Sequence, residues 1–407
     1  MKNESSLFKT IISQTRLKLF PKSENVEVFD MRMSFVLPEW ILRYPPGGFN
    51  VVFQLASRLA KEGHQVTLVH MNDRYKYLYD SFFDKRFLHR EFRSWRTHTR
   101  LRSNSLTRKS IAAFYRLTQK IDYDYSILMN VRSQGTYQST SIPVSDLIFA
   151  TSWETAFIVY DYVRQMNSRP QAYYLIQNSE DDPSYSGELN QYARMSYSFP
   201  LRKIVINQKL LRRFKDDDPF LMNVGIDTKY YRVLNDIQKR NSMSIFIQLR
   251  SGEAKGSSIG LEAVGRLHEL RPEIQFHAFG DISLSEIPSY ISYLRFPTRL
   301  ELRNLYNQCA IFVLPSLVEG FSLTTLEAMS CGACVVATNC GGTTDYIEST
   351  ENGILVRSND SNAIVNAVLN LVDHSDLRIE MARRGTAVSQ KYSYDSMYES
   401  FKGIITR

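Results

Sequence analysis

Two glutamates eight positions apart are the residues of this sequence best placed to do chemistry. Glu319 follows the apolar run AIFVLP, and Glu327 lies in the helical-looking stretch that comes next, within LVEGFSLTTLEAMSCG. A carboxylate just past a strand end faces the crevice where α/β proteins bind ligands. The second carboxylate suits a vicinal diol such as a ribose, because it accepts hydrogen bonds from both hydroxyls.

The residues between the two glutamates predict an anion site at the start of a helix. We expect the side chain of Ser322 to cap that helix, and the free backbone N–H groups there, together with the helix dipole, to attract phosphate. Gly320 would let the backbone approach a phosphate closely. One nucleotide sugar would then place its sugar at Glu319, its ribose at Glu327 and its phosphates on Gly320, Phe321, Ser322 and Leu323.

Two further loops carry candidate donor contacts. The stretch QLRSGEAKG, which follows an apolar run, places Arg250 and Lys255 five positions apart. Two cations at a strand end could clamp a diphosphate and stabilise it as it leaves. Gly47 and Gly48, in PPGGFN, open a long helical stretch and could bring backbone N–H groups to the ligand from across a cleft, although a glycine pair also serves as a plain turn.

Short apolar runs alternate with helical stretches along the chain. We predict strands over 29–37, 65–70, 125–131, 146–151, 172–177, 203–207, 243–249, 274–279, 310–314, 334–338 and 353–356. We predict helices over 49–62, 257–270, 298–308, 361–372, 377–390 and 394–404. This alternation is typical of βαβ units, so we expect an α/β protein with two doubly wound, Rossmann-like domains and a cleft between them.

These motifs resemble those of the family 4 glycosyltransferases, which are retaining enzymes with the GT-B fold. The two glutamates, with GFS, LEAMSCG and the following VVAT strand, look like the family's E-x7-E motif, and RSGEAKG resembles its R-x4-K element. NVGID at 223–227 is similar to a further family turn, with Val224 and Gly225 in swapped order. GGTTDYI at 341–347 is similar to the family's GG-x-x-E segment, with Asp345 in place of the glutamate.

The resemblance implies a role for each matching residue. Glu319 would hold the donor sugar and, with Arg250 and Lys255, form the catalytic set. Glu327 would bind the ribose, and Arg250 and Lys255 would bind the diphosphate. Gly47 and Gly48 would approach the donor from the N-terminal side. No metal or other cofactor is implied. We expect an acceptor-binding domain over 1–235, a nucleotide-sugar-binding domain over 236–390, and a helix over 391–407 that crosses back.

One departure from the family narrows the expected donor. Where many members carry a histidine that meets a sugar hydroxyl, this chain reads DLIFATSWETAF, with Trp153 and Glu154. We expect these two residues and Gln177 to contact the acceptor. The absence of the histidine fits a 6-deoxy sugar, and the chain resembles bacterial S-layer glycan rhamnosyltransferases that use dTDP-rhamnose. A UDP- or GDP-linked sugar, and a sugar-nucleotide epimerase of the same fold, remain alternatives.

The charge is distributed unevenly. The net charge of +8 combines a balance of +12 over residues 1–240 with −4 over 241–407. The densest basic region, 85–120, holds eleven Lys or Arg and one acid, with aromatic residues between them. It suits a nucleic acid, an anionic membrane, a phosphorylated carrier or simply solvent. Because Glu319 and Glu327 would repel a phosphate backbone, we expect a nucleotide sugar and a saccharide acceptor, lipid-diphosphate-linked in one reading, rather than nucleic acid.

The remaining features predict location and exclude other sites. The first residues lack the apolar core of a signal peptide, so we expect a cytoplasmic protein, with the inner membrane face as a peripheral location. Asp216 to Asp218 contain a DxD pattern, which we interpret as a polar turn and not as a metal site. We expect the four cysteines to be buried around a helix–strand turn, since no second ligand pair accompanies Cys331 and Cys334.

Overall fold

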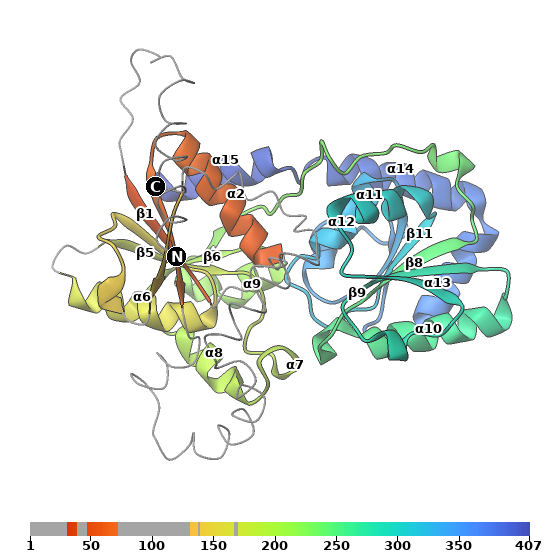
Figure 1. The fold of residues 1–407 in the computed structure, drawn as a ribbon, viewed down its shortest axis with the longest axis horizontal. Coiled ribbons are helices and arrows are strands. Elements are labelled where there is room, and N and C mark those ends of the chain that lie inside the picture. Colours follow the sequence, from red (N-terminus) through yellow and green to blue (C-terminus); the bar gives the residue numbers. More distant parts are fainter. Residues whose placement is uncertain (1–30, 39–46, 72–130, 137–138, 167–169) are drawn as a thin grey trace, which may run out of the picture. The chain divides into compact units, whose positions relative to one another are not determined.

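The first of two sheets is built from seven parallel strands (Figure 1). The computed structural model describes residues 31–38, 47–71, 131–136, 139–166 and 170–407. The strand order is β3-β2-β1-β4-β5-β6-β7. The strands are β1 Arg32–Leu37, β2 Gln65–Met71, β3 Arg132–Thr136, β4 Leu147–Ala150, β5 Gln171–Ile176, β6 Arg202–Val205 and β7 Phe220–Leu221.

Helices follow most strands of this sheet, as βαβ units require. β1 leads into α2, whose buried face packs against β2. The helices are α2 Gly47–Lys61, α6 Trp153–Gln165, α7 Pro183–Ser186, α8 Asn190–Ser196 and α9 Gln208–Arg213, with 3-10 turns at η3 Ser139–Ser141, η4 Gly187–Leu189 and η5 Lys215–Asp217.

The second sheet has six parallel strands in the order β10-β9-β8-β11-β12-β13. They are β8 Ser244–Leu249, β9 Gln275–Gly280, β10 Ile291–Arg295, β11 Ile311–Leu314, β12 Cys334–Thr338 and β13 Ile354–Val356. Every residue of β8, β11 and β12 is buried, which is why these strands read as continuous apolar runs. The central strands therefore present only their ends and the loops that follow them to a ligand.

Helices cover both faces of the second sheet (Figure 1). α10 packs beside α13 on one face, and α12 packs beside α11 and α14 on the other. The helices are α10 Ser257–Leu270, α11 Arg299–Gln308, α12 Leu323–Ser330, α13 Ser361–Asp373, α14 Ser375–Ser389 and α15 Tyr394–Ile405, with 3-10 turns at η6 Ile237–Lys239, η7 Glu253–Lys255, η8 Leu284–Glu286 and η9 Gly342–Asp345.

The last helix packs against the first sheet. In α15 the ring of Phe401 lies 5.4 Å from that of Phe149 in β4, and Lys402 pairs with Glu62 at 3.2 Å. Just before α15, the amide of Ile226 donates to the carbonyl of Tyr392 at 2.8 Å. A side chain at Gly225 would lie 2.2 Å from the carbonyl oxygen of Ser393, so the NVGID turn needs its glycine at this position. The limits of the predicted domains stay a prediction.

The predicted α/β architecture of two doubly wound domains is confirmed. Two strands were not predicted: β7, which has two residues, and β10, whose sequence ISYLR has no continuous apolar run. The strand predicted over 125–131 falls mainly on residues outside those described, and β3 begins at Arg132. The basic region 85–120 lies wholly outside them.

Two smaller sequence predictions were also tested. All four cysteines are unpaired and buried, as predicted. Asp216 and Asp217 lie in the turn η5, where Asp217 pairs with Lys203 at 3.2 Å, which fits a polar turn. Within the described parts of the chain, no helix has the length and apolar character needed to cross a membrane.

Candidate functional site

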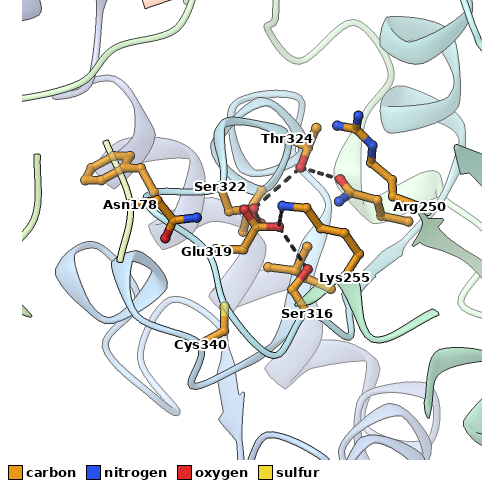
Figure 2. Close-up of polar contacts among 12 residues, drawn as sticks. Asn178, Arg250, Lys255, Ser316, Glu319, Ser322, Thr324 and Cys340 are labelled. Carbon is orange, nitrogen blue, oxygen red and sulfur yellow. Dashed lines mark hydrogen bonds and ion pairs between the residues drawn. The ribbon is translucent and has the colours of Figure 1, made fainter. Parts of the chain in front are cut away.

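Glu319 is held in place by a cation and a hydroxyl group (Figure 2). Its Oε1 accepts hydrogen bonds from Lys255 Nζ at 3.0 Å and from Ser316 Oγ at 2.9 Å. The other oxygen, Oε2, accepts no hydrogen bond from the described residues. The side chain is 12% exposed, so Glu319 presents one fixed carboxylate with a free oxygen at the carboxyl end of β11.

The loop that carries Glu319 is fixed from two sides. The amides of Leu317 and Val318 both donate to the carbonyl of Ala254, at 2.8 and 3.1 Å. The amide of Glu319 itself donates to the carbonyl of Cys340 at 2.9 Å. Gly256 has a left-handed φ of 60°, and a side chain there would lie 2.1 Å from Pro315 O, so this close approach requires glycine. These contacts bring the loop of Lys255 against that of Glu319.

Arg250 does not join Lys255 in this structure. Its guanidinium lies 3.7 Å from the carboxylate of Asp281, and in Figure 2 no contact joins it to Glu319 or Lys255. Arg250, Ser251, Asp281 and Ser283 are among the residues that line an open cavity of about 490 Å³. Lys255 contacts Glu319, whereas Arg250 lies near Asp281. The predicted clamp of two cations on one diphosphate therefore stays a prediction.

The start of α12 leaves its first amides uncovered. The N–H groups of Gly320, Phe321 and Ser322 donate no hydrogen bond to any described residue. The predicted capping by the Ser322 side chain is wrong: its backbone is left-handed, with φ 62° and ψ 75°, and its Oγ lies 2.7 Å from Thr325 Oγ1 instead. Phe321 is buried and packs on Tyr346, so only its backbone faces a ligand.

Glu327 lies on the partly exposed face of α12, as do Leu323 and Thr324. Its Oε2 accepts a hydrogen bond from the hydroxyl group of Tyr306 at 3.1 Å. Burial raises the pKa of Glu327 to about 7, while the hydrogen bond from Tyr306 and the charge of Arg299 act in the opposite direction. Glu327 therefore titrates near neutral pH.

Two of the predicted glycines, Gly320 and Gly48, approach Gln177, which follows β5. A side chain at Gly320 would lie 1.9 Å from the carbonyl oxygen of Gln177, and one at Gly48 would lie 3.0 Å from its Oε1. A side chain at Gly47 would lie 3.3 Å from Cδ1 of Leu323. From the sequence, we expected a glycine at position 320 because it would let the backbone approach a phosphate closely. In the structure the close approach of the Gln177 carbonyl requires this glycine.

The predicted acceptor residues are not all accessible. Trp153 and Glu154, at the start of α6, are buried, and the ring of Trp153 packs edge-on against Phe157. This favours a packing role for Trp153 over the predicted contact. Gln177 is partly buried, and its carbonyl oxygen lies close to Gly320.

Sequence reasoning missed two residues that contact the predicted glutamates, Ser316 and Tyr306. Ser316 lies three positions before Glu319 in PSLVE, and that spacing alone does not predict a hydrogen bond. Tyr306 lies in a helix 21 residues before Glu327, with no sequence signal that connects the two.

Sequence comparisons find a family match over the second sheet. Residues 245–374, which contain both glutamates and both cations, match the family described as Glycosyl transferases group 1. An uncharacterized glycosyltransferase of Methanocaldococcus jannaschii is 30% identical over 95 residues, which cover 23% of this chain and 27% of the relative. Sucrose-phosphate synthase of Zea mays is 42% identical over 84 residues, which cover 21% of this chain and 8% of that relative. The matches thus span less than a third of either relative.

Structural comparisons extend over the whole fold. HepE of Anabaena, solved in complex with UDP and glucose, has a TM-score of 0.65 at 16% identity, over 92% of this chain and 99% of HepE. TarM, a Staphylococcus aureus protein, has a TM-score of 0.64 at 14% identity, over 94% of this chain and 100% of TarM. At these identities the likeness concerns the fold alone, and that fold is GT-B, as predicted.

Proposed function

We propose that this chain is a retaining glycosyltransferase that moves a sugar from a nucleotide donor to a saccharide acceptor. One observation carries the proposal: the Glu319 carboxylate, paired with Lys255 at 3.0 Å, lies one residue before the uncovered start of α12. A fixed carboxylate beside a cation and free amides suits a sugar joined to a diphosphate. The family match of residues 245–374 supports the same chemistry.

In the proposed reaction the bond between the anomeric carbon and the diphosphate oxygen breaks. An acceptor hydroxyl oxygen forms the new bond on the same face, and its proton passes to the departing diphosphate oxygen. Glu319 orients the sugar hydroxyls and favours the positive charge that grows at the anomeric carbon. Lys255, Arg250 and the amides at Gly320 to Leu323 stabilise the diphosphate, and in this proposal no metal is required.

The proposed donor is dTDP-rhamnose, because the sequence resembles that of rhamnosyltransferases and lacks the family's histidine near Trp153. A UDP-linked sugar is the second candidate, since a structure of HepE with the same fold contains UDP-glucose. We propose that Gln177, with its neighbour Asn178, meets the acceptor. In this proposal the acceptor is a saccharide, carried on a lipid diphosphate, in surface glycan assembly. Such an acceptor would bring the protein to the inner face of the membrane.

A nucleotide panel and a product assay test the proposal together. Calorimetry with dTDP, UDP, GDP and ADP should show binding of one nucleotide above the others, strongest for dTDP. Incubation of the matching nucleotide sugar with a saccharide acceptor should give a product whose anomeric configuration, read by NMR, equals that of the donor. Release of free nucleotide with no acceptor present would instead favour the epimerase. No binding of any nucleotide would overturn the proposed function.

A further inference from the structure

Side chains hold three consecutive carbonyl groups of the turn that leads into α12. The amide nitrogen Nδ2 of Asn207 donates to the carbonyl oxygen of Gly320 at 2.7 Å. The hydroxyl oxygen of Tyr346 lies 3.0 Å from the carbonyl oxygen of Phe321 and 3.2 Å from that of Ser322. A phenol has one proton, so these two carbonyls share it in a three-centre hydrogen bond.

Both side chains are themselves fixed. Asn207 is buried, and its Oδ1 caps α9 by accepting from the amide of Leu210 at 2.8 Å, which leaves its nitrogen as the end that donates. Tyr346 is buried too, with ring centroids of Phe321 at 5.3 Å and Tyr392 at 5.9 Å. Burial raises the pKa of Tyr346, so its hydroxyl group keeps the proton that it donates.

A side chain that holds a carbonyl also sets the direction of the next amide. In a planar trans peptide, the C=O of one residue and the N–H of the next point in opposite directions. The amides that follow the three held carbonyls, those of Phe321, Ser322 and Leu323, therefore point away from the groups that hold them. None of the three donates to a described residue. Ser322 is left-handed and Leu323 begins the helix, and successive N–H groups in such a turn form an anion-binding concavity.

We propose that Asn207 and Tyr346 are positioning residues that aim these three amides at the diphosphate of the donor. The inference rests on the proposed function, in which the amides at the start of α12 stabilise the diphosphate. Each residue acts through a backbone carbonyl and not by contact with the ligand. Asn207 belongs to the loop after β6, so a residue of the first sheet is needed for full donor affinity.

Two near-isosteric substitutions test the two residues separately. Tyr346→Phe keeps the packed ring and removes the hydroxyl group. Asn207→Asp keeps an oxygen that can cap α9 and removes the N–H groups that hold the carbonyl of Gly320. We expect each variant to bind dTDP and UDP about threefold to tenfold more weakly than the wild type by calorimetry, the value of one hydrogen bond.

The matching nucleosides separate positioning of the amides from a general structural role. Thymidine and uridine lack the diphosphate, so NMR titration should give them wild-type affinity in both variants. A change that merely loosened the fold of the site would weaken nucleosides and diphosphates alike.

Two matched variants control for the groups removed. Tyr162→Phe deletes another buried phenol hydroxyl, which donates to Pro143 O at 3.1 Å in the first sheet. Asn235→Asp deletes another side-chain amide that donates to a carbonyl, that of Asn307 at 3.2 Å. Both controls should bind dTDP and UDP like the wild type.

Two results would overturn the inference. A folded variant whose affinity for dTDP and UDP falls less than threefold removes its residue from the proposal. An equal loss of nucleoside and diphosphate affinity replaces positioning of the amides by a structural role. In both cases the wild type still binds nucleotide, so these results are distinct from a failure of the proposed function, in which the wild type binds none of the four nucleotides.

Discussion

Lys255 and Glu319 are 64 positions apart in the sequence, yet their side chains meet at 3.0 Å. The contact joins the loop after β8 to the loop after β11, two strands that are neighbours in the sheet. Both side chains are largely shielded, with exposures of 22% and 12%. In the proposed function, this contact brings recognition of the sugar and of the diphosphate to one point.

The first prediction concerns the cations. Lys255→Ala should weaken nucleotide diphosphate binding by about 1.5–3 kcal/mol, because it removes a charge-assisted hydrogen bond. Arg250→Ala should weaken nucleotide diphosphate binding less than Lys255→Ala does, since the Arg250 side chain is 43% exposed and solvent screens its charge. Calorimetry measures both.

Arg266→Ala serves as the control for charge alone. It removes an exposed arginine on α10 that pairs with Glu262, and it should leave nucleotide affinity at the wild-type value. If the Lys255 and Arg250 variants both bound nucleotide like the wild type, the clamp would be misplaced.

The second prediction concerns Ser316, which is fully buried and donates to Glu319 Oε1 at 2.9 Å. Ser316→Ala leaves Glu319 with Lys255 as its one remaining partner and frees its carboxylate to rotate. We expect turnover to fall by about tenfold, the value of one hydrogen bond to a charged group. Nucleotide affinity should stay unchanged, because in the proposed function the partner of Ser316, Glu319, contacts the sugar and not the nucleotide.

Steady-state kinetics of Ser316→Ala separates this role from a purely structural one. A positioning role lowers kcat and leaves nucleotide affinity intact, and Ser316→Thr, which keeps the hydroxyl group, should recover part of the rate. A fall in melting temperature with unchanged kcat would show that Ser316 acts in stability alone.

The third prediction concerns pH. Burial raises the pKa of Glu327 to about 7, above its ordinary 4.5, and the ionised carboxylate is the form that accepts hydrogen bonds from pentose hydroxyls. Affinity for a nucleotide sugar should therefore rise as the pH passes from about 6 to 8, through the pKa of about 7. A nucleotide sugar is the appropriate ligand because its diphosphate, unlike that of a free nucleotide, does not titrate in this range.

The same shift predicts the opposite trend in stability. A raised folded-state pKa contributes stability that is complete below about 4.5 and is lost as the pH rises through about 7. In Glu327→Gln both trends should flatten, which calorimetry and melting curves across this pH range can show. Equal pH profiles for wild type and variant would mean that another group titrates.

The fourth prediction concerns Gly320. A methyl group there would lie 1.9 Å from the carbonyl oxygen of Gln177, so Gly320→Ala must displace one of the two loops. We expect a lower melting temperature together with loss of transfer. Gly403→Ala, in α15, meets no atom within 4 Å and should stabilise by about 0.5–1 kcal/mol. Wild-type activity and stability in Gly320→Ala would contradict the close contact.

The sequence predicted the strands of the second sheet because they are buried on both faces and therefore read as unbroken apolar runs. The site loops followed from the strand ends, which is why Glu319 and Lys255 were both predicted to lie there. The left-handed backbone of Ser322 was not predicted, because serine favours this conformation weakly and the surrounding loops impose it. The Tyr306 contact with Glu327 was also missed, since it depends on how α11 packs on α12.

Glu319→Gln tests the central claim most directly. The amide keeps the size of the side chain and removes its charge, so we predict nucleotide affinity near the wild-type value by calorimetry. Transfer, measured by product chromatography, should fall by about 10²–10³, the usual cost of losing one preorganised electrostatic group at a reacting centre. Near-normal transfer in Glu319→Gln would remove this carboxylate from the mechanism and contradict the account, and lost nucleotide binding would assign it to the phosphate or pentose instead.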